Sequence, residues 1–375
     1  MKILHLCSYS LYSGPLPGVR GLGLAQRRAG HDVSVAWDTK RGAFNAFEEP
    51  AEPWFINLEI GPSLPLTLSA KSSPMEWFRD RHYLRALVLD GVDVVHTHLS
   101  HDHTLWALSQ PRRFEGVCIR TVHAERSLEP RFGQRWLNQS AQGWITRCRD
   151  HDERLAALLD SETTPRALIP GSIDSNEFMP QLYENRVAAR TRFEIDQNVP
   201  LIGHVALIAG RGQEELLAAA ELLGDEAPHI LYIGSGEGEE SLRRRVAESP
   251  IRDRVHFTGY LQGEDLLVGY AAMDAAFCAQ AGNDASVRAA LEAMSCSLPV
   301  LAVQSGALTD SIDATVGWPI EARSPEPIAQ ALSEWSKSDD LGELLGQAGR
   351  SFVLEERSFR HEAERTLALY ERCLG

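Results

Sequence analysis

The sequence predicts an α/β protein with two domains, each built on a parallel sheet covered by helices on both faces. The chain has 375 residues, 43% of them hydrophobic, which is too long for one ordinary core and sufficient for two. Its strand-like runs are short and mostly apolar instead of alternating, as strands buried on both faces should be. Helical segments separate these runs, and such alternation implies βαβ units.

The first series of strands starts at the first residues of the chain. Residues 2–7 form an apolar run that is too short for the core of a signal peptide, so we expect a strand there. A helix should follow and reach Gly30. Gly, Pro and Asp bound the later runs. Strands are predicted for residues 2–7, 32–37, 92–96, 117–123 and 167–170, and helices for residues 135–142 and 150–159.

The second series repeats the pattern after a break at residues 170–180, which contains two prolines and a glycine. We therefore expect an N-terminal domain of residues 1–178 and a C-terminal domain of residues 179–357. A final helix lies within residues 358–375, and the pattern leaves its docking site open. Strands are predicted for residues 201–206, 229–234, 255–259, 275–279 and 299–303, and helices for residues 213–223, 239–247 and 287–296.

Composition excludes several classes of protein. The formal net charge is -15, and residues 181–375 carry 17 Lys and Arg against 31 Asp and Glu, which argues against nucleic acid as a partner. No apolar run approaches the roughly 20 residues needed to cross a bilayer. The six cysteines include no CxxC pair and are expected to be buried, reduced thiols. We therefore expect a cytoplasmic protein.

Positive charge is concentrated in one stretch of the first half. Residues 112–149 contain eight arginines and three glutamates. Either these arginines are scattered over solvated helix faces, or they form a patch that faces an anionic lipid or acceptor. The second alternative would give the N-terminal domain a peripheral contact with the inner face of the membrane. No pattern in the sequence indicates the oligomeric state.

Histidines gather where the third predicted strand ends. His96, His98, His101 and His103 lie within eight residues, and His96 and His98 have the ligand spacing of metal-dependent hydrolases. Such a hydrolase needs further ligands at later strand ends, which the second half of the chain does not supply, so we keep it only as an alternative. His123 ends the next predicted strand. It either contacts a substrate hydroxyl or transfers a proton, or nearby backbone groups satisfy it.

Two glycine-containing loops follow predicted strands and lead into predicted helices. Gly14 lies after the first strand, where backbone N–H groups can approach a phosphate. Gly236 is the central of three alternate glycines at residues 234–238, a pattern that permits close approach of the backbone to a ligand. Neighbouring glutamates would repel a phosphate. This second loop therefore either contacts a ligand or only shapes its site.

The strongest candidate site spans residues 280–292. A loop leads into a predicted helix, for which Ser286 is a candidate N-cap. The free N–H groups of the first helical turn suit a diphosphate, and Arg288 adds a cation. Glu292 follows Asp284 by eight residues, about two helical turns, so both side chains share one face. Glu292 either accepts hydrogen bonds from a ribose diol or is an ordinary exposed acid on a capped helix.

Together these motifs resemble the GT-B glycosyltransferases of family 4, the glycosyl transferases of group 1, over essentially the whole chain. The most specific match is the segment 291–300, Leu-Glu-Ala-Met-Ser-Cys-Ser-Leu-Pro-Val, which is similar to the family's Glu-Ala-Met-Ala-x-Gly-x-Pro-Val signature. His123 is similar to the active-site histidine, and residues 170–180 are similar to the family's linker. A looser resemblance indicates the subset associated with envelope or lipopolysaccharide sugars.

Several positions depart from the family pattern. The family's phosphate-binding arginine falls on Leu207, and its lysine falls near Arg211. The paired glutamates of the family become Asp284 and Glu292, and Cys296 takes the place of the signature glycine. These departures keep open a second alternative, a non-catalytic GT-B protein that binds a nucleotide or a glycan.

The resemblance implies two Rossmann-like domains with parallel sheets facing a central cleft, and a C-terminal helix that packs back on the N-terminal domain. It implies a retaining, metal-independent transferase that moves a sugar from a nucleotide-diphosphate sugar to a hydroxyl acceptor. The acceptor is a glycan, a lipid or a small molecule, and no other cofactor is expected. The implied roles are catalytic for His123 and Asp284, and nucleotide-sugar binding for Gly14, Arg211, Gly236, Ser286, Arg288 and Glu292.

Overall fold

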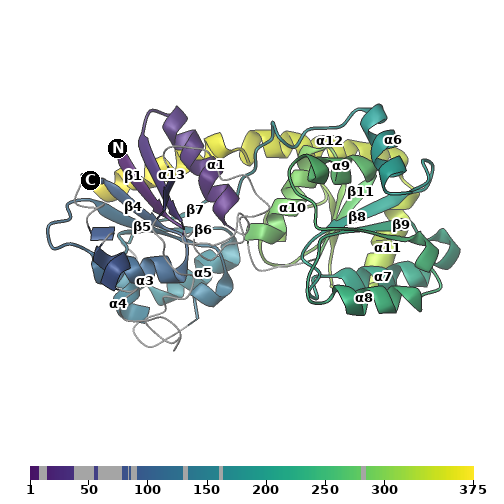
Figure 1. The fold of residues 1–375 in the computed structure, drawn as a ribbon, viewed down its shortest axis with the longest axis horizontal. Helices are drawn as coiled ribbons and strands as arrows, with labels where there is room; N and C mark the ends of the chain where they lie inside the picture. The colour runs from purple at the N-terminus through teal and green to yellow at the C-terminus, as the bar shows by residue number, and fades with distance from the viewer. Residues whose placement is uncertain are drawn as a thin grey trace. The chain divides into compact units, whose positions relative to one another are not determined.

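The computed structural model describes residues 1–7, 15–37, 55–57, 78–82, 84–85, 91–129, 134–159, 164–279 and 284–375. The chain divides into two compact units. Unit 1 contains Met1–Ser172 and Phe359–Gly375, and unit 2 contains Ile173–Gly282 and Ser286–Ser358. Each unit has its own parallel sheet with helices on both faces (Figure 1).

Unit 1 is built on a sheet whose described strands lie in the order β3-β2-β1-β4-β5-β6-β7. Alternate residues of β1 face opposite sides, because Leu4 packs with Trp106 of α3 whereas Ile3 packs with Tyr370 of α13. Helices α1 and α13 cover one face, and α3, α4 and α5 cover the other (Figure 1). The elements are β1 (Lys2–Leu6), α1 (Leu16–Arg28), β2 (Asp32–Trp37), β3 (Phe55–Asn57), β4 (Val94–Thr97), α3 (Ser100–Ser109), β5 (Val117–Val122), α4 (Gln134–Gln139), β6 (Gly143–Thr146), α5 (Arg149–Leu158), β7 (Arg166–Leu168) and α13 (Phe359–Leu374).

The C-terminal helix α13 packs against α1, β5 and β6 of unit 1. Gly21 of α1 lies so close to α13 that a Cβ atom on it would be 2.2 Å from the ring of Phe359. Arg147, which follows β6, donates a hydrogen bond to Oε1 of Glu362 at 2.7 Å, and both side chains are buried. Removing either partner would leave an uncompensated buried charge. A close helix contact and a buried ion pair therefore hold α13 on unit 1.

Unit 2 contains a second parallel sheet with the strand order β10-β9-β8-β11-β12-β13. Its first strand, β8, lies in the middle, as β1 does in unit 1, and this order is that of a Rossmann-like sheet. Helices α7, α8 and α11 lie on one face, and α9, α10 and α12 on the other (Figure 1). The elements are α6 (Tyr183–Arg192), β8 (Leu201–Val205), α7 (Gln213–Leu223), β9 (His229–Ile233), α8 (Glu239–Ala247), β10 (Val255–Gly259), α9 (Glu264–Ala272), β11 (Ala275–Cys278), α10 (Asp284–Ser295), β12 (Val300–Val303), β13 (Trp318–Ile320), α11 (Pro325–Ser336) and α12 (Asp339–Glu356).

The boundary between the units lies a few residues before the predicted one. Residues 173–178 belong to unit 2, although we predicted that they end the first domain. Phe178 is buried, and its ring meets Tyr270 edge-on with the ring centroids 5.8 Å apart. Its carbonyl accepts a hydrogen bond from the Ser295 hydroxyl at 2.6 Å. Packing on α9 and α10 therefore sets this boundary, and the spacing of prolines does not reveal such packing.

The predicted strands and helices occur in the structure with ends that differ by three residues or fewer. Three described strands were not predicted, namely β3, β6 and β13. Each is three or four residues long, which is too short to show a clear hydrophobic period. Strand β13 also contains Pro319, which argues against a central strand and fits its position at the edge of the sheet.

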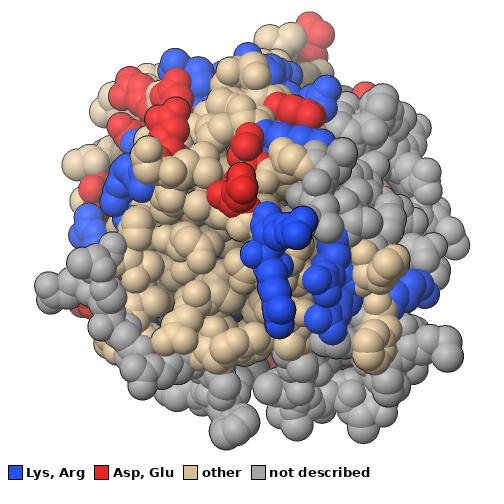
Figure 2. All heavy atoms as spheres, turned by 90° about the vertical axis from the view of Figure 1, so that its left-hand side faces the viewer, with Lys and Arg blue, Asp and Glu red and all other residues tan. Residues whose placement is uncertain are grey.

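The basic stretch of residues 112–149 is not one continuous surface patch. Arg112 and Arg113 are exposed, but Arg120 and Arg147 are buried. The Arg120 guanidinium lies over the ring of Trp144, 5.2 Å from its centroid. Figure 2 shows one face of the molecule on which Lys and Arg gather in adjacent groups, with Asp and Glu directly beside them. Among the residues that the structure describes, no helix combines the length and apolar character needed to cross a bilayer.

The end of α10 places a serine in a conformation that favours glycine. The Ser297 N–H donates to the Met294 carbonyl at 2.9 Å, and the Leu298 N–H donates to the Ala293 carbonyl at 3.0 Å. This pair of bonds defines a Schellman motif, in which the residue after the helix cap is left-handed. Ser297 occupies that position with a φ of 60°. Ser297, and not Cys296 as we predicted, therefore stands at the turn position where the family signature has glycine.

We expect Ser297→Gly to raise the free energy of unfolding by about 0.5–1 kcal/mol. A left-handed conformation costs a residue with a Cβ atom about 1–2 kcal/mol, and the greater freedom of glycine in the unfolded chain offsets part of the gain. The matched control is Ser241→Gly, at an exposed position inside α8, which should lower stability by about 0.5 kcal/mol. Chemical denaturation measures the free energy of unfolding of both variants. A loss of stability in both would contradict the left-handed conformation assigned to Ser297.

Candidate active site

The candidate residues of unit 2 follow three strands that are neighbours in the sheet. Arg211 follows β8, Gly236 follows β9, and α10 follows β11. Parallel strands end at one edge of their sheet, where ligands bind in open α/β sheets. The sheet therefore gathers these three segments at its carboxyl edge.

Glu292 is a buried carboxylate in the last turn of α10 and is only 4% exposed. The Tyr270 hydroxyl of α9 donates to Oε2 of Glu292 at 2.8 Å, and Nε of Arg288 donates to Oε1 at 2.7 Å. Burial and the charge of Glu292 raise the pKa of Tyr270 well above its usual value, so the phenol keeps its proton and remains a donor. Both carboxylate oxygens are thus oriented, and each retains capacity for a second hydrogen bond.

Tyr270 is a residue that sequence reasoning missed. It lies near the end of α9, and its side chain is buried against α10 and against Phe178. The available signal was a tyrosine in a mostly apolar helical segment, since a buried tyrosine hydroxyl usually finds a hydrogen-bond partner. The identity of that partner depends on the packing of α9 against α10.

Arg288 was predicted to supply a cation for a diphosphate. In the structure its Nε donates a hydrogen bond to Glu292. The two residues are one helical turn apart on α10, which is the spacing at which opposite charges pair. The Arg288 side chain remains 35% exposed. A guanidinium carries five N–H donors, of which the contact with Glu292 uses the one on Nε.

The start of α10 differs from the prediction in one respect. The helix begins at Asp284, so Ser286 lies inside the first turn and is not the N-cap that we predicted. The structure describes Asp284 and Ser286 by their backbone alone. Residues 280–283 and Gly14 lie outside the described residues.

The loops after β8 and β9 pack directly on each other. A Cβ atom on Gly236 would be 2.4 Å from the carbonyl oxygen of Ile208, and the Gly238 N–H donates to that carbonyl at 2.9 Å. The close backbone approach predicted for Gly236 is therefore made to Ile208. Leu207, at the position of the family's arginine, is 50% exposed, and the Arg211 side chain is partly exposed.

In unit 1, His123 lies directly after β5 and is buried. Its Nε2 is 3.1 Å from Nδ1 of His98. The partner is therefore a side chain, whereas the two predicted alternatives were a substrate and nearby backbone groups. The ligand nitrogens of His5, His96 and His98 lie within 4.8 Å of one another, and all three side chains are buried. Burial lowers the pKa of each imidazole, and neutral imidazoles are suitable metal ligands. Each ring nitrogen of these three histidines nevertheless has a hydrogen-bond partner within unit 1.

Two family models match consecutive parts of the chain. The model for Glycosyltransferase Family 4 matches residues 18–177, and the model for glycosyl transferases group 1 matches residues 187–352. Among curated proteins, a GDP-mannose-dependent monoacylated alpha-(1-6)-phosphatidylinositol monomannoside mannosyltransferase of Corynebacterium glutamicum is 27% identical over 206 residues, which are 52% of this chain. That match spans about half of the mannosyltransferase, 54% of its length. A 2-deoxystreptamine glucosyltransferase of Streptomyces kanamyceticus is 28% identical over 76% of this chain and 78% of the relative.

Solved structures show the same fold. A glycosyltransferase of Rickettsia africae superposes with a TM-score of 0.80 over 100% of this chain and 98% of that structure, at 16% identity. HepE of Anabaena in complex with UDP-glucose superposes with a TM-score of 0.79 over 99% of this chain and 100% of that structure, at 14% identity. Both sheets and the two family models agree: the chain belongs to the GT-B glycosyltransferases of family 4.

Proposed function

We propose that the protein is a retaining, metal-independent glycosyltransferase that moves a sugar from a nucleotide-diphosphate sugar to a hydroxyl acceptor. The observation that carries this proposal is the oriented carboxylate of Glu292 on the first helix after β11. A carboxylate fixed by two donors is prepared to accept hydrogen bonds from the two hydroxyls of a ribose, because its geometry is set before the ligand arrives. The family membership supports the choice of a nucleotide sugar as that ligand.

The diphosphate would be the leaving group of the reaction. In this proposal the N–H groups in the first turn of α10, including that of Ser286, bind its oxygens together with the cations Arg211 and Arg288. Fixed donors and cations stabilise the negative charge that develops on the departing diphosphate. They would supply the charge that a divalent metal supplies in other transferases, and the proposal therefore needs no metal.

The remaining roles come from the family resemblance. Asp284 and His123 would contact the transferred sugar, Gly14 would let its loop approach the phosphates, and Gly236 would shape the nucleotide site. The attacking nucleophile would be a hydroxyl of a glycan, a lipid or a small molecule. The names of two relatives include phosphatidylinositol monomannoside and 2-deoxystreptamine, which both offer several hydroxyls. A lipid acceptor would place the protein peripherally at the inner face of the membrane, and a small molecule would place it in the cytoplasm.

Binding of the donor is tested by a thermal-shift screen of GDP, UDP, ADP and their sugars, since a ligand that binds only the folded state raises apparent stability. A matching nucleotide at 100 times its Kd should stabilise the protein by about 2.7 kcal/mol.

Transfer should then proceed in excess EDTA, and proton NMR of the product should show the anomeric configuration of the donor. Loss of transfer in EDTA, or inversion of the anomer, would refute those parts of the proposal. Nucleotide binding without transfer or donor hydrolysis would favour the non-catalytic alternative, to which the exposed Leu207 gives some support.

Removing the carboxylate should weaken nucleotide binding strongly. We expect Glu292→Ala to raise the Kd for the nucleotide by at least about a hundredfold, because two hydrogen bonds to a charged acceptor are lost at about 1.5–3 kcal/mol each. Tyr270→Phe keeps the carboxylate and removes one of its orienting bonds, so a smaller, few-fold rise is expected. Glu334→Ala, which removes an exposed acid of α11, is the control. Calorimetry measures all three, and parent-like affinity of Glu292→Ala would exclude Glu292 from the site.

A further inference from the structure

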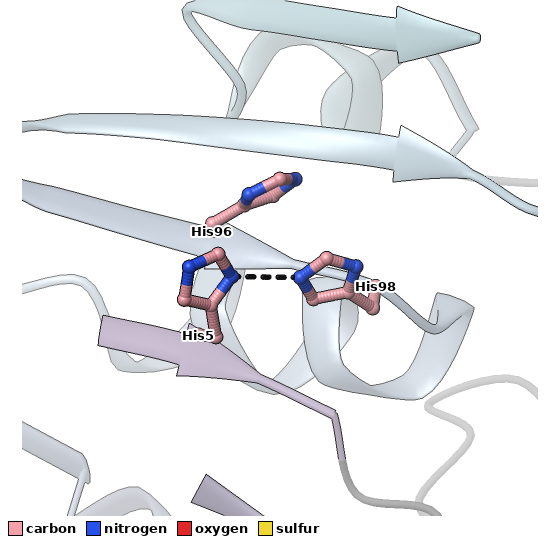
Figure 3. A group of neighbouring side chains, drawn as sticks. All are labelled: His5, His96 and His98. Atoms are coloured by element: carbon pink, nitrogen blue, oxygen red, sulfur yellow. Dashed lines mark hydrogen bonds between the residues drawn. The ribbon is translucent and has the colours of Figure 1, made fainter. Parts of the chain in front are cut away.

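A row of imidazoles crosses the interior of unit 1. His5 lies in β1, His96 in β4, His98 just after β4 and His123 just after β5, on strands that are neighbours in the sheet. Figure 3 shows the rings of His5, His96 and His98 facing one another, with His5 and His98 joined by a hydrogen bond. The first three side chains are at most 3% exposed, and His123 is 8% exposed. The first three have no role in the proposed function.

The row forms a continuous chain of hydrogen bonds that ends at Gln26 of α1. Nε2 of His123 is 3.1 Å from Nδ1 of His98, and Nε2 of His98 is 2.9 Å from Nδ1 of His5. Nε2 of His5 is 2.8 Å from Oε1 of Gln26. A neutral imidazole has one donor nitrogen and one acceptor nitrogen. The group that donates at one end of the chain therefore determines which nitrogen carries the proton in each following imidazole.

The imidazoles in the interior of the chain are neutral. Burial lowers the pKa of His5 to about 4, against an ordinary value of 6.5. Burial also places the pKa of His98 and of His96 well below that value, and the neighbouring imidazoles and the Arg147 guanidinium lower them further. At neutral pH the rings of His5, His96 and His98 thus each carry one proton, as a directional chain requires.

A second branch of hydrogen bonds runs from the same amide. Nε2 of Gln26 donates to the Tyr370 hydroxyl at 3.4 Å, and this hydroxyl is 2.6 Å from Nδ1 of His96. Nε2 of His96 is in turn 2.7 Å from Oγ1 of Thr121. In the structure Oε1 of Gln26 faces His5 and Nε2 faces Tyr370, and this orientation satisfies both branches. The opposite orientation would reverse every donor in both, so the direction of the whole network is coupled to the orientation of the Gln26 amide.

With the Gln26 oxygen facing His5, the directions follow in order. His5 donates from Nε2 to Gln26, so its Nδ1 accepts from Nε2 of His98. Nδ1 of His98 must then accept, and the proton of His123 must lie on Nε2. We propose that His98, His5 and Gln26 are positioning residues that hold His123 in the Nε2-protonated tautomer, so that its Nδ1 is an acceptor for a sugar hydroxyl. This assignment of Nδ1 rests on the proposed function, in which His123 contacts the transferred sugar.

A metal ion in the histidine cluster would impose the opposite arrangement. A metal bound to Nδ1 of His5 and Nε2 of His98 would replace the hydrogen bond that these two nitrogens now share. The proton of His98 would then lie on Nδ1 and be donated to His123, because a metal-bound nitrogen carries no proton. Nε2 of His123 would then accept a hydrogen bond from Nδ1 of His98, and the proton of His123 would lie on its Nδ1. The tautomer of His123 thus distinguishes the two arrangements.

The tautomer is measured by long-range proton–nitrogen NMR of the full chain labelled with 15N-histidine, after treatment with EDTA. Protonated and bare ring nitrogens have well-separated shifts, and His123→Ala assigns the signals. We expect a bare Nδ1 in the parent at pH 7.5 and a mixture of tautomers in His98→Leu. His98→Asn offers an oxygen near the position of Nδ1 and should restore the parent pattern. A proton on Nδ1 of His123 in the parent, or an unchanged tautomer in His98→Leu, would overturn the proposal.

Kinetic measurements supply a second test, because a purely packing role of His98 would not give the pattern expected for a positioning role. His98→Leu should lower kcat roughly five- to tenfold, because the loss of one oriented hydrogen bond lowers a rate by about that factor. The Kd of the nucleotide should stay within twofold of the parent value. His98→Asn should remain within twofold of the parent in both. Equal losses in both variants would reduce His98 to a packing residue and overturn the proposal. Gln26→Met, which acts two rings away from His123, serves if His98→Leu does not fold, and it should also give mixed tautomers of His123.

The outcomes separate this inference from the proposed function. If the parent shows no transfer but His123 carries its proton on Nε2 and loses that preference in His98→Leu, the positioning of the tautomer stands and the transferase proposal fails. If the parent transfers sugar and His98→Leu keeps both the tautomer and kcat, the transferase proposal stands and the positioning role fails.

Discussion

The hydrogen bonding of parallel strands is the constraint on which the candidate site depends. Strands of a parallel sheet start at one edge and end at the other, so segments far apart in sequence meet where their strands end. In unit 2 this brings together the loops after β8 and β9 and the start of α10. In unit 1 it places His98 beside His123 through the neighbouring strands β4 and β5. Neither pairing could be formed by contacts within one helix or one loop.

The second constraint is that buried polar groups must be paired. Glu292, His5, His96 and His98 are enclosed, and an unpaired polar atom in such a place would cost about 1–3 kcal/mol. The carboxylate oxygens and the ring nitrogens of these four residues all have partners, and pairing also fixes orientation. Tyr270 and Arg288 hold the carboxylate in one direction, and Gln26 does the same for a row of imidazoles. Groups that serve stability in this way are also prepared for a ligand, because their geometry is set in advance.

Two departures from the family pattern have different physical consequences. Ser297 replaces a glycine at a left-handed turn, and its cost is backbone strain at the end of α10, away from the helix N-terminus that is proposed to bind the diphosphate. Leu207 replaces a cation at the carboxyl edge of the unit 2 sheet, and its cost is a missing positive charge near that proposed anion site. The first departure concerns stability, and the second concerns function. The pairing of Arg288 with Glu292 shows that the nearby cation is already partly committed.

The sequence by itself determined the α/β class, the two sheets, most elements and the choice of Glu292 and His123 as candidates. These follow from local periodicity, from turn residues and from a short signature, all of which are properties of neighbouring residues. Tertiary structure alone decided that Phe178 belongs to unit 2, that Tyr270 orients Glu292, and that Gln26 lies at the end of a chain of imidazoles from His123. It also decided that Arg120 and Arg147 are buried and are no part of a surface patch. Side-chain partners of this kind come from elements that are distant in sequence, and only the packing of helices on a sheet brings them within hydrogen-bond distance.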